Sequence, residues 1–528
     1  MSPTIAGLRI VPPYIAPQPA AASTTASSQA EPAKVIPSTT VSLGQTSTSG
    51  NDARTYTPRG ALGPTQVRYV LEQDSLDKLS FRLMSGAQSA AIGSRFQGLG
   101  AALLEQLVAN GGQSISQAVL SYADGAQPSA EVLRLQGNQL REEPTNAVNL
   151  SLTTASGATV TLALASGEKG LAVSAEVQGG QLSADELNGL AALTDSFESA
   201  INGLTQEPPK LQLGALAKLD PALFTSLKMN ARLDTPSGEQ QLFDLNLNDS
   251  ARTLSLQGPN GNVQLNLDTR DTTLLGSSSQ RQAAISNYLS QFDAAQRRGK
   301  GDENLVSLFK DAFVQLNSAD DSGRASSVNN PVLAAKDRVL LSGLADFSAS
   351  ISQHRQQINP LQPGEVDRFD YKVSQTTTVR GTAQSTRSVQ QDQQARLSAA
   401  YHASLNPQVA LKLDHDPQSQ NYRYHEINDQ ASSSTRLAYD KTRLVDASAT
   451  QQASQNERIR TYVNGELNSD VSTPKSVSES RNLLGLLNDV FQRERISLKE
   501  RGLSILEAQL QSQRSQWLLK SDPSAIRS

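Results

Sequence analysis

The chain of 528 residues contains no cysteine, and aromatic residues make up only 4% of it. The absence of cysteine excludes disulfide bonds, thiolate nucleophiles and every metal site built on cysteine ligands, while it leaves the cellular compartment open. Hydrophobic residues account for 37% of the chain, which is little for a compact enzyme of this length. We therefore expect modest hydrophobic cores and extended solvated surfaces, divided over more than one domain.

An excess of charge of one sign is also lacking, because 47 basic residues stand against 51 acidic ones and the net charge is −4. No dense run of Lys and Arg interrupts this balance. The chain thus has no field that would steer nucleic acid or an anionic membrane toward it. Nucleic acid is not an expected partner.

Long apolar runs are missing as well. The first residues carry a single basic side chain, Arg9, and no apolar run of the length that a cleavable secretory signal requires. Nothing later approaches the roughly 18 consecutive apolar residues of a membrane span. We expect a protein without a membrane span that either stays in the cytoplasm or is exported by a signal-peptide-independent route.

Catalytic and nucleotide-binding motifs do not occur in their required context. The sequence has no Gly-x-Ser-x-Gly elbow, no Walker pattern and no EF-hand pattern. The glycines Gly93, Gly98 and Gly100 lack the preceding strand and the spacing of a dinucleotide fingerprint. The sequence therefore predicts no catalytic residue and no cofactor.

What the sequence does contain is a layout that occurs twice, over residues 148–204 and 228–298. In each copy, alternating strands with Ser, Thr and Gly turns lead into an amphipathic helix, and each carries the element Leu-x-Thr-x-Ser-Gly. Internal similarity of this kind indicates one supersecondary unit used twice. Alternating strands bury only one face, so each meander needs a helix as cover. Ser183 and Glu186 form a capping box that starts the first such helix.

These patterns predict an α+β fold of two repeated antiparallel β-meander-plus-helix modules, long helices, a polar β arm and a disordered N-terminus. The expected divisions are a disordered Pro/Ser/Thr/Ala-rich tail (1–64), a first module (65–205), a second module (206–325), a long helix (326–362), a polar Gln/Ser/Thr-rich β region (363–475) and a C-terminal amphipathic helix (476–528). The tail is expected to be disordered because it cannot bury enough apolar area to offset the entropy of its chain.

Two stripes of apolar residues predict the long helices, over residues 331–359 and about 478–520. Pro331 and Pro360 are good start and stop signals for the first, and Gly502 marks a shift in the second stripe. The helices are expected either to pack within the chain or to mediate self-association or binding of a protein partner. The residues predicted to carry these contacts are Leu340, Leu344, Phe347, Ile351, Leu484, Leu487, Phe491, Leu506, Leu510 and Trp517.

Three of the four histidines lie close together in the polar β region, with carboxylates beside them. Imidazole and carboxylate ligands suit zinc or another divalent ion. The candidate ligands are His402, His415, His425, Asp414 and Asp416. Strand alternation turns His402 away from the face of Tyr401, and His415 falls in a turn, so the three rings are not expected to converge. We predict no metal site.

The absence of cysteine, the few aromatics and the Gln/Ser/Thr/Ala bias resemble proteins secreted in one step from the bacterial cytoplasm, including flagellum-associated substrates. The resemblance covers no motif. It departs from flagellin-like proteins, whose two ends both form helices, because Pro3, Pro12 and Pro13 forbid an N-terminal helix. It implies a non-catalytic bacterial structural or protein-interaction protein, exported without a cleaved signal peptide.

The alternative function is that of a hydrolase acting on a cell-surface polymer through carboxylates in the β region. Such an enzyme would bring two carboxylates together in a cleft and separate their pKa values. The two functions therefore differ in a property that a structure can display.

Export without a cleaved signal makes a direct prediction. The protein should accumulate in the culture supernatant with residues 1–64 still attached, which mass spectrometry of the secreted chain would measure. A cytoplasmic enzyme assayed in the same supernatant controls for lysis. Recovery from the cell pellet alone, or a chain cut within the first 64 residues, would contradict the export prediction.

Overall fold

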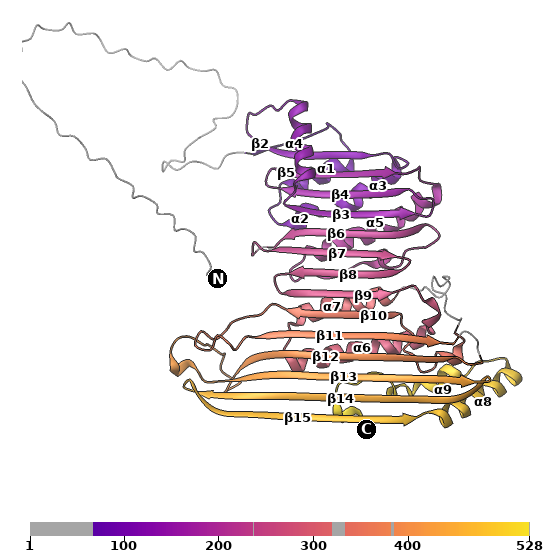
Figure 1. The fold of residues 1–528 in the computed structure, drawn as a ribbon. Coiled ribbons are helices and arrows are strands. Elements are labelled where there is room, and N and C mark those ends of the chain that lie inside the picture. Colours follow the sequence, from indigo (N-terminus) through magenta and orange to yellow (C-terminus); the bar gives the residue numbers. More distant parts are fainter. Residues whose placement is uncertain (1–66, 236, 319–332, 382–384, 527–528) are drawn as a thin grey trace, which may run out of the picture. The chain divides into compact units, whose positions relative to one another are not determined.

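The computed structural model describes residues 67–235, 237–318, 333–381 and 385–526. Residues Thr65–Ser528 form one compact unit. Its framework is a single antiparallel sheet of 15 strands (Figure 1). The α+β class is thus confirmed, with one sheet dominating the fold. The tail predicted over residues 1–64 lies outside the described residues.

The strands follow one another across the sheet almost in chain order. The order is β1-β2-β5-β4-β3-β6, after which β7 to β15 are added in sequence. Their bounds are β1 (Val67–Leu71), β2 (Ile115–Ala123), β3 (Asn146–Thr154), β4 (Thr159–Gly167), β5 (Gly170–Gln178), β6 (Phe224–Asp234), β7 (Gln240–Asn248), β8 (Ala251–Gly258), β9 (Gly261–Asp268), β10 (Asp346–Gln353), β11 (Arg368–Arg380), β12 (Ser388–Ser404), β13 (Tyr422–Asp440), β14 (Arg443–Val463) and β15 (Glu466–Asn482).

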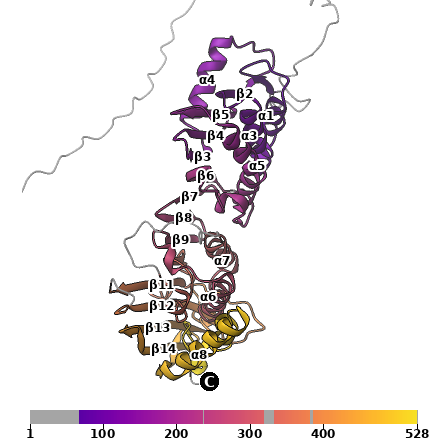
Figure 2. The ribbon, with the colours of Figure 1, turned by 90° about the vertical axis from the view of Figure 1, so that its right-hand side faces the viewer.

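Most helices gather on one face of the sheet (Figure 2). Their bounds are α1 (Lys78–Ala87), α2 (Ile92–Phe96), α3 (Leu99–Ala109), α4 (Ala130–Glu142), α5 (Ala184–Leu204), α6 (Ser278–Gly299), α7 (Glu303–Asn317), α8 (Leu484–Arg501), α9 (Leu506–Gln511) and α10 (Pro523–Ile526). Helix α4 packs on the opposite face, where Leu133 and Leu140 contact Ala118 and Leu120 of β2. None of the helices in the described part of the chain is both long and apolar enough to cross a membrane.

The main core lies between the sheet and the helices, and strand alternation decides which residues enter it. In β3, Val148, Leu150 and Leu152 are buried, whereas Asn149 and Ser151 between them are only partly covered. A strand places successive side chains on opposite faces, so a period of two fills one face with apolar residues and leaves the other polar.

The element shared by the two predicted modules does form the same turn twice. Thr154 N donates to Ala158 O over 2.8 Å and Thr235 N donates to Glu239 O over 2.8 Å. Each turn ends on a glycine with positive φ, 95° at Gly157 and 81° at Gly238. The similarity is confined to the turn.

The prediction of two superposable modules is not confirmed. Strands β3 to β5 precede α5, but β6 to β9 precede α6, so the two stretches differ in strand number. Strand β3 also pairs with β6, from Ala147↔Arg232 to Thr154↔Phe224. The two stretches therefore share one sheet and one core, because their edge strands hydrogen-bond to each other.

The prediction of one long helix over residues 326–362 is wrong. Among its described residues, Ala335–Asp337 form one 3-10 turn and Asp346–Gln353 form β10. Strand β10 pairs with β9 on one side and β11 on the other. Phe347, Ala349 and Ile351 face the core at a period of two. The apolar residues fitted a heptad by coincidence, and pairing on both sides made the extended chain the stable choice.

The prediction of a single C-terminal helix over residues 476–528 is also wrong. Its first residues belong to β15, which ends at Asn482. Helix α8 then spans 18 residues and stops at Gly502, whose φ of 67° gives a left-handed C-cap. A short helix, α9, follows. The shift of the apolar stripe at Gly502 thus marked a helix end, where glycine adopts this conformation without steric cost.

Buried glutamines on β12 and β14 form hydrogen bonds with the backbone of the irregular segments that cover these strands. Gln391 Oε1 accepts a hydrogen bond from Ser342 N over 2.8 Å, and Gln393 Oε1 accepts one from Leu519 N over 2.9 Å. Gln451 Nε2 donates to Leu518 O over 2.5 Å. These irregular segments lack a ladder of their own, so the glutamines supply the partners that buried backbone groups require.

The core position of Phe347 yields a stability prediction. The ring makes edge contacts with Tyr288 and Phe313, whose centroids both lie 5.1 Å away. Phe347→Ala should lower the free energy of unfolding by about 3 kcal/mol or more, because it removes buried area and leaves a cavity. Denaturant unfolding followed by circular dichroism would measure this.

The matched control is Phe81→Ala, because the side chain of Phe81 is 72% exposed. This control should change the free energy of unfolding by no more than about 0.5 kcal/mol. Equal effects of the two substitutions would contradict the placement of Phe347 in the core.

Candidate functional site

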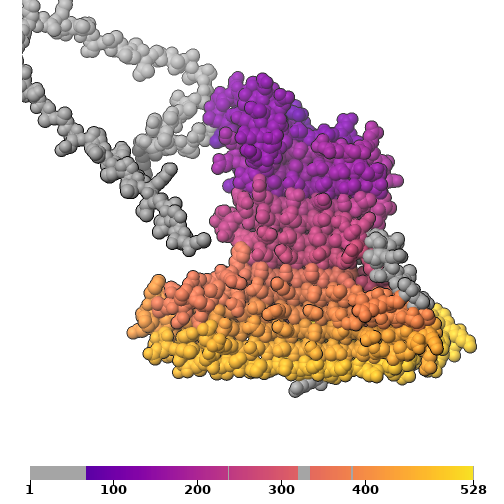
Figure 3. Space-filling view, viewed as in Figure 1, coloured from indigo at the N-terminus to yellow at the C-terminus, as the bar shows by residue number. Residues whose placement is uncertain are grey.

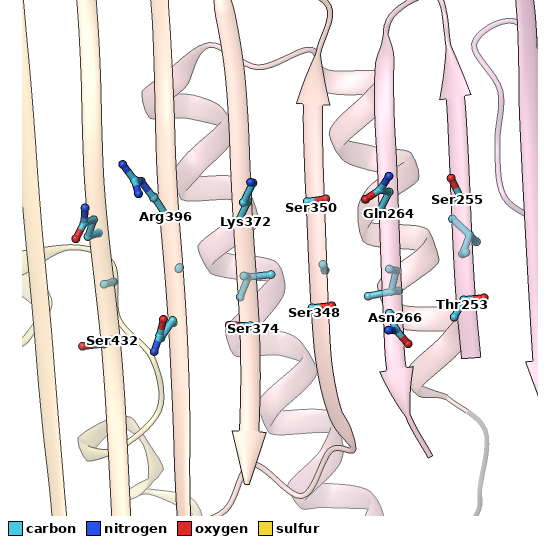
Figure 4. Close-up of a pocket in the computed structure, with 18 of the residues that line it drawn as sticks. Thr253, Ser255, Gln264, Asn266, Ser348, Ser350, Lys372, Ser374, Arg396 and Ser432 are labelled. Carbon is cyan, nitrogen blue, oxygen red and sulfur yellow. The ribbon is translucent and has the colours of Figure 1, made fainter. Parts of the chain in front are cut away.

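The face of the sheet opposite the main core carries two rows of polar side chains, which we call the polar face. Cross-strand pairing aligns one row as Thr253, Asn266, Ser348, Ser374, Gln394, Ser432, Gln452 and Ser478. It aligns the second row as Ser255, Gln264, Ser350, Lys372, Arg396, Gln430, Ser454 and Ser476. Figure 4 shows part of both rows on neighbouring strands, from Thr253 and Ser255 to Ser432, with helices behind the sheet.

The polar face contains a shallow groove with a volume of about 1370 Å³, lined from β6 to β15. Its lining includes no aromatic residue, and its charged side chains are Lys228, Asp244, Lys372 and Arg396. Figure 3 shows the surface that these strands present on this side. Both neighbours of every interior strand are hydrogen-bonded to it, so the backbone holds each row in a fixed register.

One end of the polar face is covered by the connections over residues 354–367 and 405–421. Beneath them lie the buried Tyr422, Tyr424 and Tyr462, with Leu411 packed against them. The three tyrosines stand on the polar face of β13 and β14, where an uncovered side chain would meet water. The connections therefore give this end of the polar face a small core of its own.

A buried polar cluster, the Glu365 network, ties the connections to the sheet. Tyr422 and Tyr462 donate hydroxyl hydrogen bonds to the carboxylate of Glu365 over 2.7 and 2.8 Å. Arg460 Nη1 lies 3.2 Å from the same carboxylate. The imidazole of His402, which is fully buried, lies with Nε2 3.4 Å from Glu365 Oε2.

The second ring nitrogen of His402 completes this network. His402 Nδ1 lies 2.6 Å from Asp367 Oδ1. Burial alone would lower the pKa of His402, but hydrogen bonds and the charges of the two carboxylates raise it above its ordinary value. Burial alone would raise the pKa of Glu365, but hydrogen bonds from its neighbours lower it. The network thus favours an imidazolium held between two carboxylates.

The structure separates the three histidines that were candidate metal ligands. His425 lies on the opposite side of the sheet from His402, where its Nδ1 is 2.8 Å from Glu457 Oε1. His415 lies in the connection over residues 405–421 with the other two candidates, Asp414 and Asp416. Within the described ranges, no group of three or more His, Asp or Glu side chains is arranged to hold a metal ion.

The residues predicted to bind a partner lie mainly inside the chain. Leu344, Phe347 and Ile351 belong to the main core. A second cluster contains the buried Leu340, Leu487, Leu510 and Trp517, with the partly buried Leu484, Phe491 and Leu506 packed against it. The seven buried side chains stabilise the fold and are not on the surface that a partner would meet.

One pair of neighbouring carboxylates has separated pKa values, but both lie outside the β region of residues 363–475 to which the hydrolase alternative assigned its carboxylates. Burial raises the pKa of Asp346 to about 6, whereas a hydrogen bond from Arg270 lowers the pKa of Asp268, its neighbour on β9. Both oxygens of Asp346 accept hydrogen bonds from Thr377, over 2.6 and 2.7 Å. Neither aspartate lines the groove. Asp346 fastens β10 to β11 through Thr377, while Asp268 pairs with Arg270. The hydrolase alternative stays a prediction.

Sequence reasoning identified neither the polar face nor Glu365, Asp367 and Arg460. A signal was present, because Ser, Thr, Asn and Gln recur at alternate positions of β12 to β15. It was obscured because the core-facing positions of the same strands also include polar residues, such as Gln391 and Gln451. The partners of Glu365 come from three separate strands, so no local spacing could reveal them.

The Glu365 network predicts a defined pH dependence. The stability that comes from the raised pKa of His402 is fully present below its unfolded value of about 6.5 and is lost as pH rises through the folded value. The contribution of Glu365 is present above about 4.5 and is lost as pH falls through its lower folded value. Amide protection of residues 359–366 should therefore be greatest between about pH 4.5 and 6.5.

Hydrogen exchange corrected for intrinsic rates would measure this protection. His402→Gln should remove the loss of protection on the alkaline side, because the substituted amide does not titrate. Arg495→Gln, on the exposed part of α8, is the control and should keep the wild-type profile. An alkaline loss that persists in His402→Gln would show that another group controls these connections.

Comparisons with known proteins add no relative from which a function could be transferred. No family model, no curated protein and no solved structure matches this chain. The polar face and the Glu365 network are therefore the features from which function has to be argued.

Proposed function

We propose that this protein is a non-catalytic interaction protein that binds its partner through the polar face. The observation that carries this proposal is the pair of polar rows that run unbroken from β8 to β15 and line a broad groove. Broad polar grooves without converging catalytic groups favour binding over chemistry. The partner is a hydrophilic macromolecule, since the groove spans many strands.

The arrangement of the helices supports this choice of surface. Helices α6, α7 and α8 pack against strands between β9 and β14 and lie on the core side, as Figure 2 shows. The residues first predicted to bind a partner are used in that core. The polar face is thus a large surface that the helices leave available for recognition.

The composition supports a finer proposal about where the protein acts. We infer that it is a bacterial structural or interaction protein exported without a cleaved signal peptide. Its low aromatic content and Gln/Ser/Thr/Ala bias carry this part, together with the absence of cysteine. Export and binding are independent, because a groove on the polar face could act in either compartment.

Photo-crosslinking in the producing cells tests the proposed surface. A diazirine amino acid would replace Gln394 or Gln452 on the polar face, both exposed. Lys218 and Arg495, exposed positions outside the polar face, are the matched controls. Adducts should form at the two polar-face positions and not at the controls. Equal adducts at all four positions, or adducts at the controls alone, would contradict the proposal.

A further inference from the structure

Two basic side chains face each other in the second row of the polar face. Lys372 of β11 and Arg396 of β12 are direct cross-strand partners, and both are exposed. Neither forms an ion pair with any described residue, although Asp370 lies two positions from Lys372 on the same face. Like charges directly opposite each other destabilise a sheet. A bound anion would remove this repulsion.

The surroundings of the two cations are hydrogen-bonding groups. Ser350 stands opposite Lys372 on β10, and Gln430 stands opposite Arg396 on β13. The first row adds Ser374 alongside them. Neighbouring strands are about 4.8 Å apart, so the groove presents one hydroxyl or amide at each step. That spacing is close to one sugar residue of an extended polysaccharide.

The composition of the groove argues against three other classes of ligand. Protein interfaces use aromatic and large apolar anchors, and the groove exposes none of the aromatic kind. Neutral sugars are bound largely by stacking on aromatic rings, which are missing for the same reason. Duplex DNA carries, on each strand, one phosphate per roughly 3.4 Å of helix axis. The groove offers Lys228, Lys372 and Arg396, with Lys228 about 24 Å from Lys372 across five strand spacings.

We propose that the groove binds an acidic polysaccharide, with a sugar carboxylate held between Lys372 and Arg396 and neighbouring sugar hydroxyls bonded to the polar rows. The guanidinium group matches a carboxylate with two parallel hydrogen bonds, and the ammonium group adds a point charge. The single pair of facing cations suits a ligand of which one carboxylate is bound by charge and the remaining contacts are made by hydroxyl groups. This inference rests on the proposed function and names the chemistry of its partner.

Calorimetric titration of the full chain with oligogalacturonate tests the inference. The wild-type protein should bind the free acid and lose affinity as salt is added. The methyl ester of the same oligomer keeps the hydroxyls but lacks the charge, and it should bind at least about tenfold more weakly. The double variant Lys372→Gln/Arg396→Gln should lose affinity for the free acid by a similar factor.

The control variant is Lys218→Gln/Arg495→Gln, which removes the same charge from exposed positions away from the groove. It should bind the free acid as the wild type does, and circular dichroism should show all variants folded. Equal affinity for acid and ester, unchanged binding by the groove variant, or tighter binding of single-stranded DNA of the same length would overturn the inference.

The two proposals can fail separately. If crosslinks form at Gln394 and Gln452 while oligogalacturonate does not bind, the polar face is an interaction surface for another ligand and only the polysaccharide assignment falls. If crosslinks are also absent, the proposed function falls with it.

Discussion

The structure depends on keeping fifteen strands in one register while only one face of the sheet is covered by the main core. A shift of one residue in any strand would exchange its core-facing and outward-facing side chains. In β10 such a shift would place Ser348 and Ser350 against the helices and expose Phe347 to water. The apolar face therefore specifies the register, and the register in turn aligns the polar rows. The alignment of the polar face is thus a consequence of how the core is built.

Some strands are covered by helices and others by irregular segments, and this difference explains why glutamine side chains are buried. Regular helices cover the apolar strands, and the backbone groups inside each helix hydrogen-bond to one another. Strand β12 is partly covered by irregular segments near Ser342 and Leu519, whose backbone groups need other hydrogen-bond partners. Gln391 and Gln393 supply them. Leaving such a group unpaired costs about 1–3 kcal/mol, so these glutamines are structural residues despite their polarity.

Charge on the polar face is handled in two ways. In the Glu365 network, every charged group has a partner, and the network holds two connections over one end of the face. At Lys372 and Arg396, two like charges stand side by side in solvent. The first arrangement is a closed, buried cluster, and the second leaves two exposed charges for which we propose a bound anion. This contrast supports the proposal that the groove is the recognition surface, while the Glu365 network fastens the connections at its end.

Local patterns in the sequence determined the hairpins and the helix that starts at the Ser183 capping box, because turn and cap chemistry acts over a few residues. They also determined the α+β class, since alternating and helical periods are readable along the chain. Tertiary structure alone decided that residues 346–353 form a strand. Their apolar residues fit either period, and the choice came from hydrogen bonds to β9 and β11. The groove on the polar face was decided in the same way. It unites residues from ten strands, which become neighbours only after the sheet has formed.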